Sequence, residues 1–553
     1  IVLFNIIKLI NDEDKESLAE SIGDELVTKS NIVDGFNLVQ GFLNLVIADT
    51  FYIDSLHFAL TNESFFEIKS KDDIDTFMVE YSSPNTNKPL HLGHIRNNLL
   101  GYSISKILEA NGKKVIKTQI INDRGIHICK SIVAWKLYGE NSTPESTGIK
   151  GDEFVGNYYV LFEKKHKEEV EELISNGINK EEAVNQSNIM KLAKETLKNW
   201  ENGDKEVRDI WKMMNDWVYV GFEETYNTLG VSFDKNYYES ETYLLGKEIV
   251  NYGLENNVFY KKEDSSIWVD LTDDGLDEKL LLRSDGTSVY MTQDLGTAKQ
   301  RIDDFPEIGG MVYTVGNEQD YHFQVLFKIL KRLGYKWANN LFHLSYGMVD
   351  LPTGKMKSRE GKVIDADDLV LQLIESVKET SHNLGKFQND DNAITEDTYR
   401  KIALGALKYF ILKVDPKKRI LFNPEESIDL SGNTGPFIQY TYVRIHSILN
   451  KLEKVENSKI IKYKLNEKEK DTIKCINRYN DIIKNAKDEL SPAIICNYLY
   501  DLVKTFNSLY QNHNILSAET PDSIVIRTQI SFLTGKVISK TTDLLGIELP
   551  DKM

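Results

Sequence analysis

The stretch from Val79 to His94 constrains the fold more than any other part of the chain. Residues 77–81 alternate as in a buried strand, and two prolines then end that strand and hold a loop extended. Beyond the loop, apolar residues recur at helical spacing until Gly112, which supplies a stop. A strand, a sharp loop and the start of a helix therefore follow one another, as they do in the parallel sheet of an α/β domain.

Two histidines, His91 and His94, are expected at the start of this helix, where free N–H groups and the helix dipole favour an anion. Open α/β sheets bind their ligands at this carboxyl edge of the strands. Gly93 lies between the histidines and has no side chain, so a nucleotide could lie close to the backbone. The pattern His-x-Gly-His is short, however, and a histidine near a helix start is as easily a cap or a packed core residue.

A basic, glycine-containing loop lies far along the chain at residues 354–362 and reads Gly-Lys-Met-Lys-Ser-Arg-Glu-Gly-Lys. Its composition suits a mobile lid over phosphates, although such loops are usually solvated surface. In order and separation, the two motifs resemble the HIGH and KMSKS signatures of class I aminoacyl-tRNA synthetases. The longer strings Ser-Ser-Pro-Asn-x-x-Lys-Pro-x-His-x-Gly-His and Lys-Met-x-Ser-Arg-x-Gly resemble the versions of arginyl-tRNA synthetases, and the resemblance covers nearly the whole chain.

Composition places the chain among ordinary globular proteins with several domains. Its 553 residues are 41% hydrophobic, and the net charge of −18 argues against a broad nucleic-acid coat but not against a local basic track. Three scattered cysteines show neither metal spacing nor a disulfide framework, and no apolar run is long enough to cross a membrane. We therefore expect a cytoplasmic protein with no membrane partner, and one that lacks some native N-terminal residues because the chain begins without Met.

Changes of pattern along the chain predict a multidomain α/β protein. Strands expected at 77–81, 114–121 and 310–315 alternate with helices, which indicates a doubly wound, Rossmann-like parallel sheet. No Gly-x-Gly-x-x-Gly follows the first strand, so a tightly bound organic cofactor is not expected. The predicted parts are a small α+β N-terminal domain at 1–75, a catalytic domain at 76–350 with a helical insertion at about 140–235, the lid loop and a connector at 351–395, and an all-helical domain at 396–553.

In the family that the sequence resembles, these parts contact different regions of tRNA. The N-terminal domain contacts the corner of the tRNA, the insertion lies beside its acceptor end, and the all-helical domain binds the anticodon. The resemblance implies the same roles here. The aromatic residues of the helix that starts at Gly435, among them Phe437, Tyr440 and Tyr442, are expected in the core of the all-helical domain.

The resemblance implies an arginine–tRNA ligase. The carboxylate of L-arginine would attack the α-phosphate of ATP, which arrives with Mg²⁺, and expel pyrophosphate; the arginyl group would then move to the 3′ end of tRNA(Arg). Such phosphoryl transfer needs alignment and charge stabilisation more than covalent help. No resident metal is expected, and the resemblance implies a monomer that needs bound tRNA before it activates arginine.

Four side chains are expected to meet the phosphates. His91 and His94 would donate to the developing charge, and Lys355 would neutralise the leaving pyrophosphate as the lid closes. Ser358 stands where the general class I lid has its second lysine, and Lys88, shortly before the first histidine, is assigned as the compensating cation. The further ATP-binding residues that the resemblance implies are Leu92, Gly93, Gly316, His322, Met348, Val349, Met356 and Ser358.

The amino-acid pocket should be anionic. A guanidinium is planar, permanently charged and presents a fork of donors, so a selective pocket needs carboxylates placed for bidentate hydrogen bonds. Asp294 matches the acid that reads the guanidinium in the family, and Tyr290, one helical turn earlier, would lie beside it. Glu80, Asn85 and Gln319 match the positions that complete the pocket and hold the α-amino and carboxylate groups.

Three alternatives remain open. Another class I synthetase, for glutamate, glutamine or cysteine, would need a cationic or metal-binding pocket, and the sequence shows neither. A nucleotidyltransferase with the same histidine motif has no reason to carry a helical domain behind the lid. A non-catalytic RNA-binding paralogue should have lost His91, His94 or Lys355, and all three are present.

Overall fold

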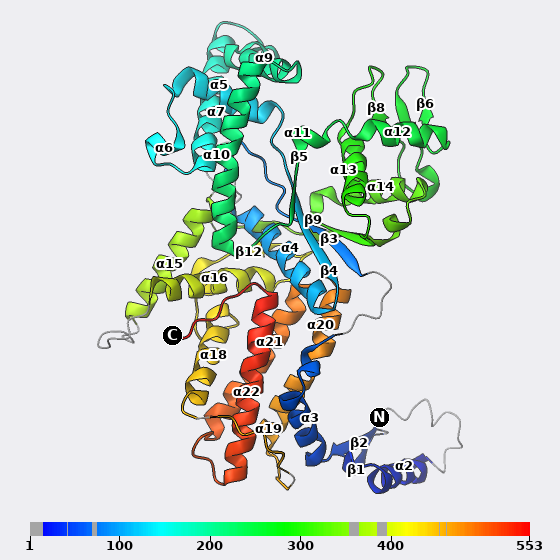
Figure 1. The fold of residues 1–553 in the computed structure, drawn as a ribbon, viewed down its shortest axis with the longest axis vertical. Coiled ribbons are helices and arrows are strands. Elements are labelled where there is room, and N and C mark those ends of the chain that lie inside the picture. The colour runs from blue at the N-terminus through cyan, green and yellow to red at the C-terminus, as the bar shows by residue number, and fades with distance from the viewer. Residues whose placement is uncertain are drawn as a thin grey trace.

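A five-stranded sheet with the order β10-β9-β3-β4-β5 lies at the centre of the molecule (Figure 1). Every neighbouring pair of its strands is parallel, so the predicted α/β fold class is confirmed. The strands are β3 (Thr76–Glu80), β4 (Lys114–Ile121), β5 (Lys235–Tyr238), β9 (Gly310–Gly316) and β10 (Leu341–Tyr346). This computed structural model describes residues 15–40, 42–68, 75–352, 364–383, 395–452, 454–460 and 462–553.

Helix α4 (Leu92–Ala110) follows β3 and joins the sheet to the helical part of the molecule. It packs against β3, β4 and β9 of the sheet, and also against α16, α20 and α22 of the C-terminal part. Ser103 on α4 donates a hydrogen bond to the carbonyl oxygen of Leu544 at 2.8 Å, and Asn111 donates one to that of Ile483 at 3.1 Å. The helix that begins at the histidine motif is therefore bonded directly to the C-terminal domain.

The insertion is helical, as predicted, and lies at the top of Figure 1. After it the chain returns to the central sheet at β5 and then forms a small antiparallel sheet. The helices before β5 are α5 (Ile126–Tyr138), α6 (Pro144–Thr147), α7 (Gly151–Ser175), α8 (Lys180–Gln186), α9 (Asn188–Glu201) and α10 (Lys205–Leu229). The elements after β5 are α11 (Glu239–Thr242), α12 (Gly246–Glu255), β6 (Tyr260–Lys261), β7 (Ile267–Val269), β8 (Lys279–Leu282), α13 (Tyr290–Asp304) and α14 (Asp320–Arg332).

The C-terminal part consists mainly of helices, and most of them lie in the lower half of Figure 1. Its elements are α15 (Ala366–Asn383), α16 (Glu396–Leu412), α17 (Pro424–Ser427), α18 (Gly435–Leu449), α19 (Glu467–Asn477), α20 (Tyr479–Asp488), α21 (Pro492–Asn512) and α22 (Pro521–Leu544), with β11 (Val349–Asp350) paired to β12 (Ile420–Leu421). In α18, Val443 and Ile445 are buried, whereas Phe437, Tyr440 and Tyr442 are only half-buried. Phe437 and Tyr442 nevertheless pack against the main hydrophobic core, which confirms the prediction for these two. Tyr440 instead lies beside Arg444, with its ring centroid 4.9 Å from the guanidinium.

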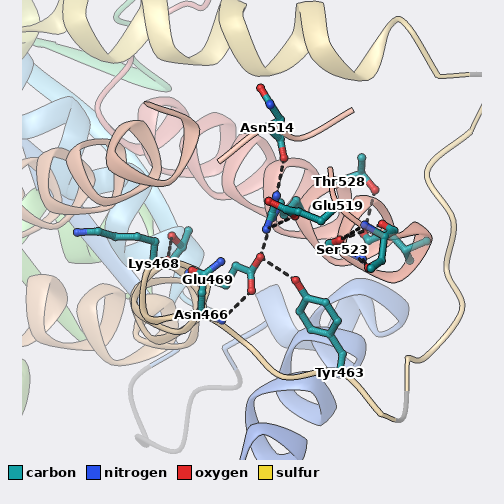
Figure 2. A network of polar contacts seen from close by, with 12 residues as sticks. Tyr463, Asn466, Lys468, Glu469, Asn514, Glu519, Ser523 and Thr528 are labelled. Carbon is teal, nitrogen blue, oxygen red and sulfur yellow. Dashed lines mark hydrogen bonds and ion pairs between the residues drawn. The ribbon is translucent and has the colours of Figure 1, made fainter. Parts of the chain in front are cut away.

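A buried ion pair links two helices and two loops of the C-terminal domain (Figure 2). The guanidinium of Arg527 on α22 donates to the carboxylate of Glu469 on α19 at 2.7 Å, and both side chains are buried. Glu469 also accepts the hydroxyl of Tyr463 at 3.0 Å, and Arg527 donates to the carbonyl oxygen of Asn514 at 2.7 Å. These additional hydrogen bonds offset the cost of burying two charges.

The N-terminal domain is the small α+β unit that the sequence predicts, and it lies beside the helical domain (Figure 1). It comprises α2 (Lys15–Lys29), the antiparallel pair β1 (Val33–Val39) and β2 (Phe42–Ile47), and α3 (Asp49–Thr61). Helix α3 packs against α19 and α22. Ion pairs join Asp49 to Lys470 at 2.9 Å and Glu63 to Lys536 at 2.7 Å. Across the described parts of the chain, none of the helices combines the length and apolarity needed to cross a membrane.

Candidate active site

The two histidines of the first motif lie at the start of α4, as the sequence predicts. His91 is the N-cap residue, and its Nδ1 accepts a hydrogen bond from the N–H of Gly93 at 3.1 Å. The Nδ1 of His94 accepts the N–H of His91 at 3.1 Å, and the two ring centroids lie 4.0 Å apart. Because each Nδ1 is an acceptor, the single proton of each neutral ring lies on Nε2.

Both imidazoles are neutral at physiological pH. Burial lowers the pKa of His91 to about 3, with a further contribution from the Lys88 ammonium. Burial also lowers the pKa of His94 well below its usual range, helped by His91 and Lys88. Leu92, which follows His91 in the sequence, is fully buried and anchors the first turn in the core. The two Nε2–H groups at this helix start form a pair of donors suited to phosphate oxygens.

Lys88 and the start of α15 flank the histidine motif. Lys88 and His91 line a cavity of 340 Å³ together with residues of α7 and α15. The N–H of Ala366 donates to the carbonyl oxygen of Leu90 at 2.9 Å, so α15 begins against the motif. The predicted lid residues Lys355, Met356 and Ser358 lie outside the described residues.

The loop after β3 has a strained backbone. Ser82 and Ser83 adopt left-handed conformations, with φ angles of 72° and 48°. The side-chain oxygen of Asn97 on α4 accepts the N–H of Ser82 and holds this turn in place. Strain of this kind costs about 1–3 kcal/mol per residue and clusters at functional sites. The turn leaves Asn85 exposed and pairs it with Asn122, which follows β4, so this predicted arginine-binding residue lies at the carboxyl edge of the sheet.

A carboxylate on α13 lies at the same edge. The side chain of Asp294 is 45% exposed, and one of its oxygens accepts a hydrogen bond from Nε2 of His322 at 2.6 Å. Tyr290, one turn earlier on α13, is 78% exposed. Gln319 is also exposed, in the turn that precedes α14. His322, which the sequence reasoning assigns to ATP, therefore contacts the residue that it assigns to the guanidinium.

Glu80, the last residue of β3, has its charge compensated within the protein. It is buried and forms an ion pair with Arg301 on α13. The guanidinium of Arg301 lies 5.4 Å from the ring centroids of both Tyr237 and Tyr313. Burial opposes the charge of Arg301, but Glu80 and Tyr313 more than offset this effect, so the pKa of Arg301 is raised. Glu80, which is predicted to bind the substrate arginine, is thus already paired with a residue of the protein, Arg301.

The structure adds a carboxylate that the sequence reasoning missed. Glu239 is the first residue of α11 and directly follows β5. Burial raises the pKa of Glu239 to about 7; Arg124 opposes this shift, and Asp123 and Asp294 add to it. Since the charge of Asp294 acts on Glu239, the two carboxylates belong to one anionic region. The position of Glu239 directly after a strand of the parallel sheet is the signal that could have found it.

The remaining residues assigned to ATP lie around β9 and β11. Gly316 ends β9 and is buried, so its backbone is the part that a ligand could meet. The carbonyl oxygen of Met348 accepts hydrogen bonds from Arg96 at 3.2 Å and from the N–H of Ile420 at 2.9 Å. Val349 pairs with Ile420 in the short sheet. An adenine edge at this position would therefore be read by amide N–H groups.

Two family models match the chain. The model described as tRNA synthetases class I (R), catalytic domain, matches residues 55–423, and the DALR anticodon binding domain matches residues 438–553. The arginine–tRNA ligase of Flavobacterium psychrophilum is 54% identical, over 100% of this chain and 93% of the relative. The arginine–tRNA ligase of Bacteroides thetaiotaomicron is 53% identical, with the same coverage of both chains.

Solved structures share the fold at much lower identity. Thermus thermophilus arginyl-tRNA synthetase superimposes with a TM-score of 0.80 at 22% identity, over 100% of this chain and 93% of the other. Mycobacterium tuberculosis methionyl-tRNA synthetase in complex with methionyl-adenylate superimposes with a TM-score of 0.53 at 12% identity, over 86% of this chain and 92% of the other. At such identities the likeness concerns the fold alone.

Proposed function

Since the chain belongs to the arginyl-tRNA synthetase family of class I, we propose that it is an arginine–tRNA ligase whose active site lies at the carboxyl edge of the central sheet. It activates L-arginine with ATP to arginyl-adenylate, releases pyrophosphate, and transfers the arginyl group to the 3′ end of tRNA(Arg). One observation carries the assignment of the site: the donors suited to phosphates follow β3, and the carboxylate of Glu239 follows β5 of the same parallel sheet. Asp294 contacts His322, which follows β9 of that sheet.

The phosphate side of the site is formed by His91, His94 and Lys88. The two Nε2–H groups donate to the oxygens of the α- and β-phosphates, where negative charge grows as pyrophosphate leaves. Lys88 supplies the positive charge, and we assign Lys355 of the lid to the leaving pyrophosphate. Within the described parts of the chain, no cluster of three or more His, Cys, Asp or Glu side chains could hold a metal ion. We assign Mg²⁺ to the triphosphate with which it would arrive, whose oxygens would be its main ligands.

The arginine side is formed by Asp294 and Glu239. Their oxygens accept the fork of N–H donors of the guanidinium, which a single lysine ammonium cannot satisfy. Tyr290 lies beside Asp294, while Asn85 and Gln319 hold the α-amino and carboxylate groups of the substrate. We assign Glu80 a supporting position, because its carboxylate is paired with Arg301.

The tRNA side follows from the C-terminal domain. Arg444 on α18 lies between the rings of Tyr440 and Tyr510, 4.9 Å and 4.8 Å from their centroids. Half-exposed aromatic rings beside a guanidinium are suited to stacking on unpaired nucleobases, so this face is assigned to the anticodon loop. We assign the N-terminal domain, whose helix α3 packs against α19 and α22, to a further contact with the tRNA. The boundaries near residues 75, 350 and 395 stay predictions, as do a monomeric state and a cytoplasmic location.

The reaction can be tested by ATP–pyrophosphate exchange with each of the twenty amino acids, with and without tRNA. We expect exchange with arginine alone, and only when tRNA is present. Exchange with another amino acid would contradict the proposed substrate. Exchange with arginine in the absence of tRNA would contradict only the requirement for tRNA.

The arginine side can be tested with Asp294→Ala. Truncating one member of a hydrogen-bonded charge pair costs at least about 2 kcal/mol, so the KM for arginine should rise roughly 30-fold or more, while the KM for ATP stays near the wild-type value. Asp303→Ala is the matched control, because Asp303 lies on the exposed face of the same helix and pairs with Lys299. An unchanged arginine KM in Asp294→Ala would refute the assignment.

A further inference from the structure

A hydrogen bond between two helices joins the two predicted substrate sites. Nε2 of His322, in the first turn of α14, lies 2.6 Å from Oδ2 of Asp294 on α13. An ionised carboxylate only accepts hydrogen bonds, so the proton of this bond belongs to the Nε2–H of His322. The imidazole is 26% exposed and the carboxylate 45% exposed, which leaves part of Asp294 accessible to a ligand.

We propose that His322 is a positioning residue for arginine recognition, and not a direct contact of ATP; this inference rests on the proposed function. The bond from His322 occupies one oxygen of Asp294 and so fixes the plane of the carboxylate. Each carboxylate oxygen can accept two hydrogen bonds, so both oxygens of Asp294 keep a lone pair, aimed in a defined direction, for the fork of a planar guanidinium. Without the bond, Asp294 would rotate among several side-chain conformations, and each arginine that binds would have to restrict this rotation.

The first turn of α14 is well suited to hold an imidazole in place. Phe323, the next residue, is buried and stacks on His343, with ring centroids 4.4 Å apart. His343 in turn lies 3.3 Å from the carboxylate of Asp320, and its Nε2 is 3.0 Å from the carbonyl oxygen of Val315. The backbone that carries His322 is therefore tied to both β9 and β10. A side chain on such a support can restrain the more exposed Asp294.

The same turn also bears on the other end of the substrate. Gln319, assigned above to the α-amino and carboxylate groups, directly precedes α14, and His322 follows within the first helical turn. One rigid segment thus carries a contact for each end of arginine: Gln319 directly, and Asp294 through His322. This arrangement sets the separation of the two contacts, so it favours a substrate with the length of arginine.

The test uses His322→Leu, which removes the donor, and His322→Gln, whose side-chain amide can restore an N–H near the position of Nε2. A hydrogen bond to a charged group is worth enough that His322→Leu should raise the KM for arginine roughly 10-fold or more, with the KM for ATP within about twofold of wild type. His322→Gln should recover most of the loss. His322→Leu should also reduce discrimination against homoarginine, which is one methylene longer.

Tyr321→Phe provides the matched control. Tyr321 lies on the same helical turn and donates a hydrogen bond to Asp277 at 2.6 Å, so its variant also removes one bond to an aspartate. We expect wild-type kinetics from this variant. If Tyr321→Phe raises the KM for arginine as much as His322→Leu does, then loosening this helical turn is enough to weaken arginine binding. That result would overturn the proposal. A raised KM for ATP with an unchanged KM for arginine would overturn it too.

The remaining outcomes are equally decisive. If His322→Gln binds arginine as weakly as His322→Leu while both melt at the wild-type temperature, the N–H donor is not what matters and the proposal fails. If the wild-type protein forms no arginyl-tRNA, the proposed function itself fails. Aminoacylation by the wild-type protein tests the proposed function, whereas the variants test the role of His322. Failure of one can therefore be distinguished from failure of the other.

Discussion

The phosphate side and the arginine side of the site are built in opposite ways. The phosphate side comes from one continuous stretch, in which backbone N–H groups hold two neutral imidazoles at 3.1 Å. The arginine side comes from segments far apart in the chain, and its side chains are held by one another through Glu80–Arg301 and Asp294–His322. Donors for a highly charged phosphate can thus be uncharged and rigid imidazoles. Selection of a guanidinium instead needs carboxylates that stay ionised and accessible in the folded protein.

This difference has a consequence for pH and for mutation. Neutral rings fixed by the backbone keep the same donors over the physiological range, and each can be removed without leaving a buried charge. Paired carboxylates lose their function when they are protonated, and removal of a partner leaves the other charge unpaired.

The largest effect is expected from Arg301→Met. It leaves the buried carboxylate of Glu80 without its cationic partner, with only the hydroxyl of Ser83 at 3.4 Å, and breaking a buried ion pair in this way typically costs about 3–5 kcal/mol of unfolding free energy. Urea denaturation of the wild type and the variant measures the difference.

The double variant Glu80→Gln/Arg301→Met is the control, since it removes both charges and should recover much of the lost stability. A double variant no more stable than Arg301→Met would show that packing of Arg301, and not the unpaired charge, dominates. The same protein tests Glu80: an ordinary arginine KM in the double variant would mean that Glu80 is not a ligand of arginine.

On the phosphate side, His94→Ala should lower kcat for aminoacylation about 100- to 1,000-fold, because one donor to the developing charge is lost. The KM for arginine should change little. His166→Ala is a suitable control, since His166 is a half-buried histidine of α7 whose Nδ1 lies 2.9 Å from the hydroxyl of Ser187. A kcat within tenfold of wild type in His94→Ala would show that its Nε2–H is not used.

The smallest effect is a pH dependence on the arginine side. Burial raises the pKa of Glu239 to about 7, so below that pH the carboxyl must lose a proton before it can accept a guanidinium. The value of kcat/KM for arginine should therefore fall as the pH drops below about 7, by at most about tenfold per pH unit. In Glu239→Gln, kcat/KM for arginine should be lower than in the wild type but should change less with pH. An unchanged slope of kcat/KM against pH in this variant would assign the titration to another group.

The same group makes a prediction about stability. Because its pKa is raised from 4.5 when the protein folds, the folded state holds this proton more tightly than the unfolded state. Its contribution to the free energy of unfolding is present at low pH and is lost as the pH rises to about 7. Added arginine, which favours the charged carboxylate, should raise the melting temperature more above pH 7 than below it.

Much of the fold could be predicted because it depends on local patterns. Apolar periodicity and the glycine at 112 located β4 at Lys114–Ile121 and α4 at Leu92–Ala110, and a continuous motif located His91 and His94 at a helix start. The pairing of Glu80 with Arg301 could not be predicted, since the two residues are far apart in the chain and meet only when α13 packs near β3. Glu239 was missed because the short strand β5, which it directly follows, is not among the strands expected from the sequence.

Helix α4 is a single rigid rod that is held at several points. Its first turn carries both histidines, Arg96 grips the carbonyl oxygens of Met348, Pro416 and Lys418, and Ser103 and Asn111 reach the C-terminal helices. The C-terminal helices therefore cannot rotate relative to the sheet without moving His91 and His94 or breaking these hydrogen bonds. We expect that tRNA bound to the C-terminal helices would, through α4, change the position of the two histidines that we assign to the triphosphate.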